Sequence, residues 1–212
     1  TGSADVGTTV YATAKDYSSE GYHENETHAN RVPSGPVAGD NSLVLKLYYD
    51  LDVLGYTVVY WKDNMETEEN KLGTDTGTGT LGMTIPYDTD GTRAPDGYNK
   101  TGTLNGQTTI TAVTENNVLN VIYSRRGDLG YTVRYWKDSI SEDDSNLLGT
   151  DTGAGPLGAT IPYTDGKYLP TGYVTPGKVE GQTTITAVTE NNVLNIIYSK
   201  NSNLGYTVRY WK

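Results

Sequence analysis

Cysteine and phenylalanine are both absent from the 212 residues, and histidine and methionine occur only twice each. The absence of cysteine excludes disulfide bonds, thiolate metal sites and a cysteine nucleophile. Without phenylalanine, the hydrophobic core must come from valine, isoleucine and leucine together with the rings of 18 tyrosines and three tryptophans. β-Branched and aromatic residues favour strands, so the composition predicts a mainly β protein.

Positive charge is also scarce, because 16 basic residues stand against 26 acidic ones and give a formal net charge of −10. The phosphates of nucleic acids and anionic membranes would be repelled by such a chain. The sequence has no signal peptide and no apolar run of 18 or more residues, so we expect no membrane insertion by this segment. Nucleic acid and membrane are therefore not expected as partners.

Residues for catalysis or metal binding are few and do not recur. His23 and His28 lie near the amino-terminal end, and no histidine follows them. Asp88, Asp90 and Gly91 resemble part of a calcium loop but lack its remaining ligands, and an Asx turn is the simpler interpretation. We predict that the chain is not an enzyme and holds neither a metal nor a cofactor.

Internal repeats dominate the sequence. Three strings recur: GYTV(V/R)YWK at 55–62, 130–137 and 205–212, LGTDTG followed by TIPY at 72–87 and 148–163, and GQTTITAVTENNVLN at 106–120 and 181–195. The opening glycines Gly55, Gly130 and Gly205 are spaced by 75 residues. Near-identity at a fixed period indicates a duplicated module.

These repeats predict four segments: the carboxy-terminal part of a first module at 1–52, complete modules at 53–127 and 128–202, and the opening strand of a further module at 203–212. The chain is thus expected to begin and end within modules. The connections between modules are short and are neither proline-rich nor glycine-rich, which favours modules held in a row. We expect a monomeric, elongated rod.

The opening strand of each module can be read from its alternation. Tyr56, Val58 and Tyr60 give one apolar face, whereas position 59 must tolerate solvent, since Val59 corresponds to Arg134 in the next copy. The closing strand has Leu119, Val121 and Tyr123 on one face and Asn120 on the other, because alternate residues of a strand face opposite sides.

Two turns and the absence of helix complete the expected module. Asn105-Gly106 lies between two threonine-rich runs and predicts a type I′ hairpin. The segment 115–117 predicts a second turn. No window shows a 3.6-residue period, so we expect little or no helix.

Three tryptophans, Trp61, Trp136 and Trp211, each follow the tyrosine that faces the core and should point to the opposite face. An exposed indole stacks well on the apolar face of a sugar ring, and repeated weak sites gain avidity. These residues are the candidate ligand-binding residues. The alternative is that each indole covers its own sheet or a junction with a neighbouring module.

A YTVVY or YTVRY opening strand with an acidic loop behind it, a glycine- and threonine-containing segment leading to Gly97-Tyr98, and a closing VLNVIY strand together resemble the MucBP (mucin-binding protein) repeats of Gram-positive surface adhesins. The B-repeats of listerial internalins are similar. The resemblance implies mainly β, β-grasp-like modules in an extracellular protein of the bacterial cell surface, anchored to the cell wall through other regions.

Two functions remain open. The resemblance implies an adhesin whose tandem modules bind mucin or another host glycan. The alternative is a structural stalk that projects a distal functional domain from the cell wall. The strings YWKD and TENNVLN are kept between copies and are partly exposed by our face assignment, which fits binding, but recent duplication explains their identity equally well.

Overall fold

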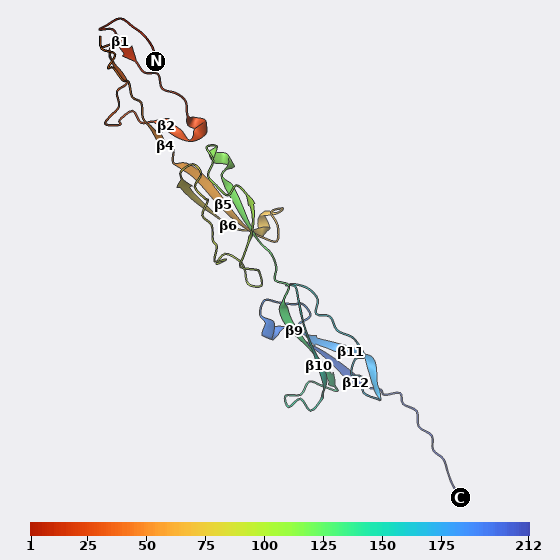
Figure 1. The fold of residues 1–212 in the computed structure, drawn as a ribbon. Helices are drawn as coiled ribbons and strands as arrows, with labels where there is room; N and C mark the ends of the chain where they lie inside the picture. Colours follow the sequence, from red (N-terminus) through yellow and green to blue (C-terminus); the bar gives the residue numbers. More distant parts are fainter. The chain divides into compact units, whose positions relative to one another are not determined.

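The computed structural model describes residues 1–212, and over these residues the chain has twelve β-strands, four single-turn 3₁₀ helices and no α-helix (Figure 1). The expected mainly β fold is confirmed. No helix is long and apolar enough to cross a membrane. The chain divides into two compact units, residues 1–89 with 103–122 and residues 90–102 with 123–212.

The amino-terminal part of the first unit contains only short strands. β1 (Thr9–Tyr11) pairs with β3 (Ser34–Pro36), and β2 (Tyr22–Glu24) pairs with β4 (Tyr49–Leu51), both antiparallel. A 3₁₀ turn, η1 (Ser18–Glu20), precedes β2. Residues 1–52 therefore form two small strand pairs rather than a four-stranded sheet.

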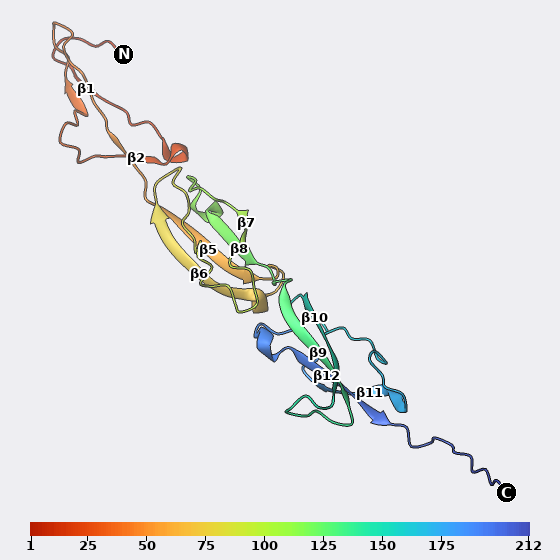
Figure 2. The same ribbon diagram turned by 60° about the horizontal axis from the view of Figure 1, so that its bottom comes forward.

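The first four-stranded sheet follows, with its strands in the order β6-β5-β8-β7 (Figure 2). Its elements are β5 (Leu54–Lys62), η2 (Glu68–Asn70), β6 (Lys71–Gly79), β7 (Thr103–Gly106), η3 (Thr114–Asn116) and β8 (Val118–Tyr123). The first and last strands of the module are thus neighbours in the middle of the sheet, which is the strand order of a β-grasp.

The second four-stranded sheet repeats this order as β10-β9-β12-β11. Its elements are β9 (Leu129–Lys137), β10 (Leu147–Gly155), β11 (Tyr173–Gly181), η4 (Thr189–Asn191) and β12 (Val193–Lys200). The central pair β9 and β12 is parallel, whereas both outer pairs are antiparallel. Each complete module predicted from the repeats contains one such sheet, without an α-helix across it.

The core of each module lies on one face of its sheet. In the second sheet it consists of Leu129, Val133, Tyr135, Ile161, Ile185, Leu194, Ile196 and Tyr198, all at most 2% exposed. The first sheet buries the equivalent residues Val58, Tyr60, Ile85, Ile110, Leu119, Val121 and Tyr123. The predicted apolar faces of the opening and closing strands are confirmed, and their burial supplies the hydrophobic free energy of each module.

The prediction that position 59 faces solvent is wrong in one copy. Val59 is only 9% exposed, whereas Arg134 at the same position of the second sheet is exposed. The strand β5 buries four consecutive residues, Val58 to Trp61. A strand buried in this way is covered on both faces, and an alternation pattern does not reveal that second cover.

The predicted hairpin at Asn105-Gly106 is also wrong. Both residues lie inside β7, where Asn105 pairs with Asn120 and Gly106 pairs with Leu119. Gly106 has a φ of +98°, and a Cβ there would lie 2.5 Å from the Val118 carbonyl oxygen. The glycine is therefore required where the strand ends, not in a two-residue turn. The second predicted turn, at 115–117, is confirmed by η3.

Candidate functional site

The candidate tryptophans are placed differently from one another. Trp61 is 9% exposed and Trp136 is 1% exposed, so in both complete modules the indole is covered, which is the alternative to an exposed sugar-stacking ring. Trp61 Nε1–H donates to Asn120 Oδ1 at 2.9 Å, and Trp136 Nε1–H donates to Asn195 Oδ1 at 2.8 Å. Each indole thus lies against its own sheet, because its apolar rings are covered and its single donor has a partner.

This hydrogen bond ties together the two central strands of each sheet. The tryptophans belong to the opening strands β5 and β9, and the asparagines Asn120 and Asn195 belong to the closing strands β8 and β12. Asn120 was expected opposite the core, and it is there, half-buried beneath the indole. The Lys71 ammonium lies 6.0 Å from the centroid of the Trp61 ring.

Trp211 is the candidate tryptophan whose indole is exposed. It is 86% exposed, in a segment that is not paired into a sheet. Its environment therefore differs from that of the two tryptophans in the complete modules, although the surrounding string is the same.

A pair of buried asparagines was missed by the sequence analysis. Asn117 and Asn192 are both 0% exposed. Asn192 Oδ1 accepts the backbone N–H of Thr186 at 2.8 Å and its hydroxyl at 2.7 Å, while Nδ2 donates to the carbonyls of Gly130 at 2.9 Å and Thr186 at 3.0 Å. Asn117 makes the same four bonds in the first sheet. The signal available in the sequence was the repeated TITAVTENN string, which keeps Thr and Asn six residues apart.

An ionic cluster on the second sheet joins β10 to the segment that precedes β11. Lys167 Nζ lies 2.6 Å from Asp151 Oδ1, and the Tyr168 hydroxyl donates to the same oxygen at 3.1 Å. The hydrogen bond from Lys167 holds the pKa of the Asp151 carboxyl below its ordinary value and raises the pKa of the Lys167 ammonium. The cluster holds this segment against the sheet.

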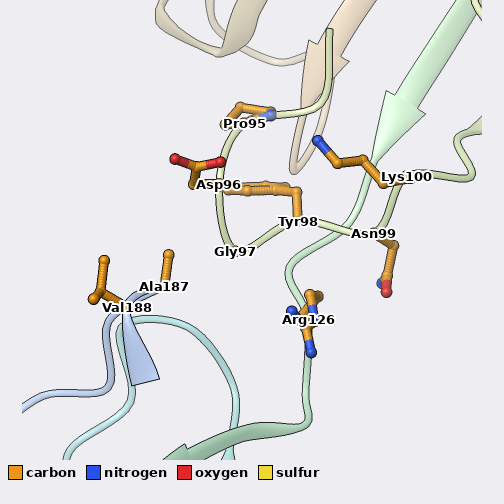
Figure 3. Close-up of a pocket in the computed structure, with 9 residues that line it drawn as sticks. All are labelled: Pro95, Asp96, Gly97, Tyr98, Asn99, Lys100, Arg126, Ala187 and Val188. Atoms are coloured by element: carbon orange, nitrogen blue, oxygen red, sulfur yellow. The ribbon is translucent and has the colours of Figure 1, made fainter. Parts of the chain in front are cut away.

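An open groove of about 460 Å³ lies within the second unit. It is lined by Pro95, Asp96, Gly97, Tyr98, Asn99, Lys100, Arg126, Ala187 and Val188 (Figure 3). Figure 3 shows the 187–188 turn facing the loop at Gly97, with Arg126 beside it and Lys100 at the far end. The groove is therefore built where one loop meets a turn and a linker.

Both cations of this groove already have partners. Lys100 Nζ donates to the Ala94 carbonyl at 3.1 Å, and Arg126 donates to both carboxylate oxygens of Asp128 at 2.9 and 3.1 Å. The Asp128 hydrogen bond raises the pKa of the Arg126 guanidinium, and the pKa of the Asp128 carboxyl is lowered in return. An anionic group entering the groove would share these donors rather than find free ones.

The two histidines lie in the first unit and have separate surroundings. His23 Nδ1 is 2.6 Å from Asp52 Oδ1, whereas the His28 ring stacks on Tyr48 with centroids 3.7 Å apart. Throughout residues 1–212, no group of three or more histidine, cysteine or acidic side chains is arranged to hold a metal ion. The calcium-loop residues Asp88 and Asp90 are thus not part of such a group.

Neither the models of known protein families nor the curated proteins match the chain.

Proposed function

We propose that the chain is a spacer segment of a bacterial cell-surface protein, in which tandem β modules carry a distal functional domain away from the cell wall. One observation supports this choice over a glycan-binding array. The residues kept between the copies serve the internal structure of each module. The proposed role is non-catalytic.

The string YWKD is the first of the kept strings. Its tryptophan is buried and hydrogen-bonded to the closing strand in both complete modules. Its aspartate, Asp63 or Asp138, has a φ of +61° or +60° just after the strand. Aspartate is one of the few residues other than glycine that adopts this conformation readily, so the tryptophan and the aspartate of this string both serve the fold of the module.

The string TENNVLN is the second. Its second asparagine is the buried Asn117 or Asn192, and its last is the partner of the tryptophan, Asn120 or Asn195. Leu119 and Leu194 belong to the core. Retention of these residues supports a module selected for its fold, as a spacer requires.

The extracellular location rests on composition and on the resemblance to MucBP repeats. The absence of cysteine and the abundance of glycine, threonine and asparagine fit strand-and-turn modules of surface proteins. The net charge of −10 fits a segment that stays in solution and does not bind polyanions.

Binding to immobilised mucin, before and after removal of its O-glycans, tests the proposal. The chain of residues 1–212 is compared with its Trp211→Ala variant, because Trp211 alone among the candidate tryptophans has an open indole. We expect no saturable, glycan-dependent binding by either protein. Saturable binding that disappears with the glycans would contradict the spacer role and establish an adhesin.

A glycan-binding adhesin is the second candidate, and the groove of Figure 3 is the observation that favours it. Lys100 and Arg126 bring two positive charges and Tyr98 brings an aromatic edge to one hollow of an otherwise acidic chain. Such a lining suits a sugar that carries a carboxylate or sulfate. If mucin binds, Lys100→Ala/Arg126→Ala should abolish binding while the control Lys178→Ala/Arg209→Ala retains it.

A further inference from the structure

One β-turn is built three times along the chain. It spans residues 5–8, 80–83 and 156–159, and each copy is closed by an N–H of the fourth residue that donates to the carbonyl of the first, at 3.0, 3.1 and 3.0 Å. The third residue is Gly7, Gly82 or Gly158, with a φ of +87°, +79° or +82°. Glycine at this position is what a type II turn requires. The second residue, at the tip, is Val6, Leu81 or Leu157.

A glycine–tyrosine loop is also built three times, at Gly21, Gly97 and Gly172. These glycines have φ values of +72°, +81° and +84°. The carbonyl of each glycine accepts a hydrogen bond from a backbone N–H of the segment after the closing strand, that of Asp52 at 2.8 Å, Arg126 at 2.8 Å and Asn201 at 2.7 Å respectively. The three loops therefore present the same backbone surface.

Two of the three loops are filled by a turn, and each of these contacts lies within one compact unit. In the first unit, a Cβ added at Gly21 would lie 3.1 Å from Leu81 Cβ. In the second, a Cβ added at Gly97 would lie 2.9 Å from Leu157 Cδ1 and 3.2 Å from Ala187 Cβ. Only glycine leaves room for the leucine in this arrangement.

Backbone hydrogen bonding accompanies the filled loop of the second unit. Leu157 N–H donates to the Arg126 carbonyl at 3.1 Å, and Arg126 N–H in turn donates to the Gly97 carbonyl. The leucine tip is thus held by polar as well as apolar contacts, which fixes how the turn sits on the loop.

One loop and one turn remain open. A Cβ added at Gly172 would have Leu204 Cδ1 as its nearest neighbour, at 4.0 Å. Val6, at the tip of the first turn, is 72% exposed. The glycine–tyrosine loop at Gly172 therefore has no turn packed into it, and the turn with Val6 at its tip fills no loop.

We propose that the Gly172–Tyr173 loop is a docking surface for another copy of this module, which binds through the tip of its Leu–Gly turn. The occupant is indicated by the two filled loops, where the same backbone already receives that turn. A contact of this size is weak between separate molecules but becomes effective when the partner is the adjoining module of one chain. The contact is head-to-tail and can therefore be repeated without limit. This inference holds whether the modules act as spacers or bind glycans.

The test adds a module to the intact chain. Residues 205–212 repeat residues 130–137 exactly in sequence, so appending residues 138–203 after Lys212 completes a further module with its own Leu–Gly turn. Amide hydrogen exchange is measured by NMR in the extended chain and in its Gly172→Ala variant. Gly127→Ala is the control, since a Cβ at Gly127 meets nothing within 4 Å.

We expect the amide of the appended leucine that corresponds to Leu157 to exchange at least about tenfold more slowly in the extended chain than in its Gly172→Ala variant. The Gly127→Ala control should leave this protection unchanged. Equal exchange with and without the Gly172 substitution would overturn the proposal.

A second measurement uses residues 1–212 alone and does not depend on the appended module. Gly97→Ala and Gly172→Ala carry similar backbone strain, because their φ values are +81° and +84°. A Cβ at Gly97 would come within 2.9 Å of Leu157 Cδ1, whereas at Gly172 the nearest atom, Leu204 Cδ1, is 4.0 Å away in ordinary contact. Gly97→Ala should lower the urea midpoint further than Gly172→Ala. When both glycine substitutions are made in a chain that already carries Leu157→Ala, the difference between their midpoints should be smaller. Equal midpoints would show that the turn does not press on the loop, and the proposal would fail.

Discussion

At the scale of single residues, Asn117 and Asn192 contribute more to the stability of the fold than is usual for asparagine. Each side chain is fully buried and makes four hydrogen bonds, two as acceptor and two as donor. An asparagine amide has two donors and one oxygen acceptor, so its whole capacity is used. Removing such a group leaves buried backbone groups without partners, which costs about 1–3 kcal/mol for each.

Asn192→Ala should therefore lower the free energy of unfolding by about 2–4 kcal/mol, because the Thr186 N–H and the Gly130 carbonyl both lose their partner. Urea denaturation followed by circular dichroism measures the change. Asn191→Ala is the matched control, since Asn191 is exposed in the same turn, and its effect should stay within about 0.5 kcal/mol. Similar effects of the two substitutions would contradict the structural role of Asn192.

The same residues show what the sequence could and could not predict. Alternation correctly placed Trp61 and Asn120 on the face opposite the core, since it follows from strand geometry alone. It could not show that the indole and the amide would cover each other, because that contact joins residues 59 positions apart. The burial of Asn117 was unpredictable for a similar reason: polar residues are usually exposed, and its partner Gly55 is 62 positions away.

At the scale of elements, the opening and closing strands were predictable from their residue patterns, whereas their order in the sheet was expected only through the resemblance to β-grasp-like modules. The opening and closing strands carry period-2 patterns, but their place at the centre of the sheet depends on a long-range pairing that no local pattern encodes, such as the parallel pairing of β9 with β12. The hairpin prediction at Asn105-Gly106 failed because the turn rule assumes that the flanking residues pair with each other. Here β7 pairs with β8, after an intervening segment that contains η3.

Substitutions at two neighbouring positions of β7 should therefore differ strongly in their effect on the free energy of unfolding. Asn105→Thr should change the free energy of unfolding by less than about 0.5 kcal/mol, because threonine suits an exposed strand position. Gly106→Ala should cost about 1–3 kcal/mol, since its φ is +98° and its Cβ would approach the Val118 carbonyl to 2.5 Å. Chemical denaturation of both variants provides the measurement, and a larger loss for Asn105→Thr would restore the hairpin interpretation.

At the scale of the whole molecule, two electrostatic effects oppose each other as pH falls. The 26 acidic residues repel one another at neutral pH, and protonating some of them reduces the net charge of −10. Other carboxylates have lowered pKa values because they accept hydrogen bonds in the folded state, as Asp16 and Asp40 do from Ser18 and Ser42, and Asp151 does from Lys167. Protonating this second group removes stabilising contacts.

The sign of the second effect follows from the direction of the shifts. A carboxyl whose folded pKa lies below its ordinary value of 3.8 stabilises the fold above that value, and the contribution is lost as pH falls through the folded pKa. Relief of repulsion acts earlier, on approach to the isoelectric point near 4.6. We therefore expect Tm at low salt to rise as pH falls from 8 to about 5 and to decrease below about pH 4.

Differential scanning calorimetry across this pH range, at low and at high sodium chloride, separates the expected rise in Tm toward about pH 5 from the expected decrease below about pH 4. Salt should raise Tm at pH 7.5, where exposed like charges dominate and are screened. Asp151→Asn should flatten the decrease below pH 4, because the contact with Lys167 no longer depends on a titrating carboxyl. The control Asp5→Asn, in the exposed amino-terminal segment, should leave the decrease in Tm below pH 4 unchanged. A Tm that falls steadily from pH 8 to pH 5 would show that the paired carboxylates outweigh the repulsion of the whole chain.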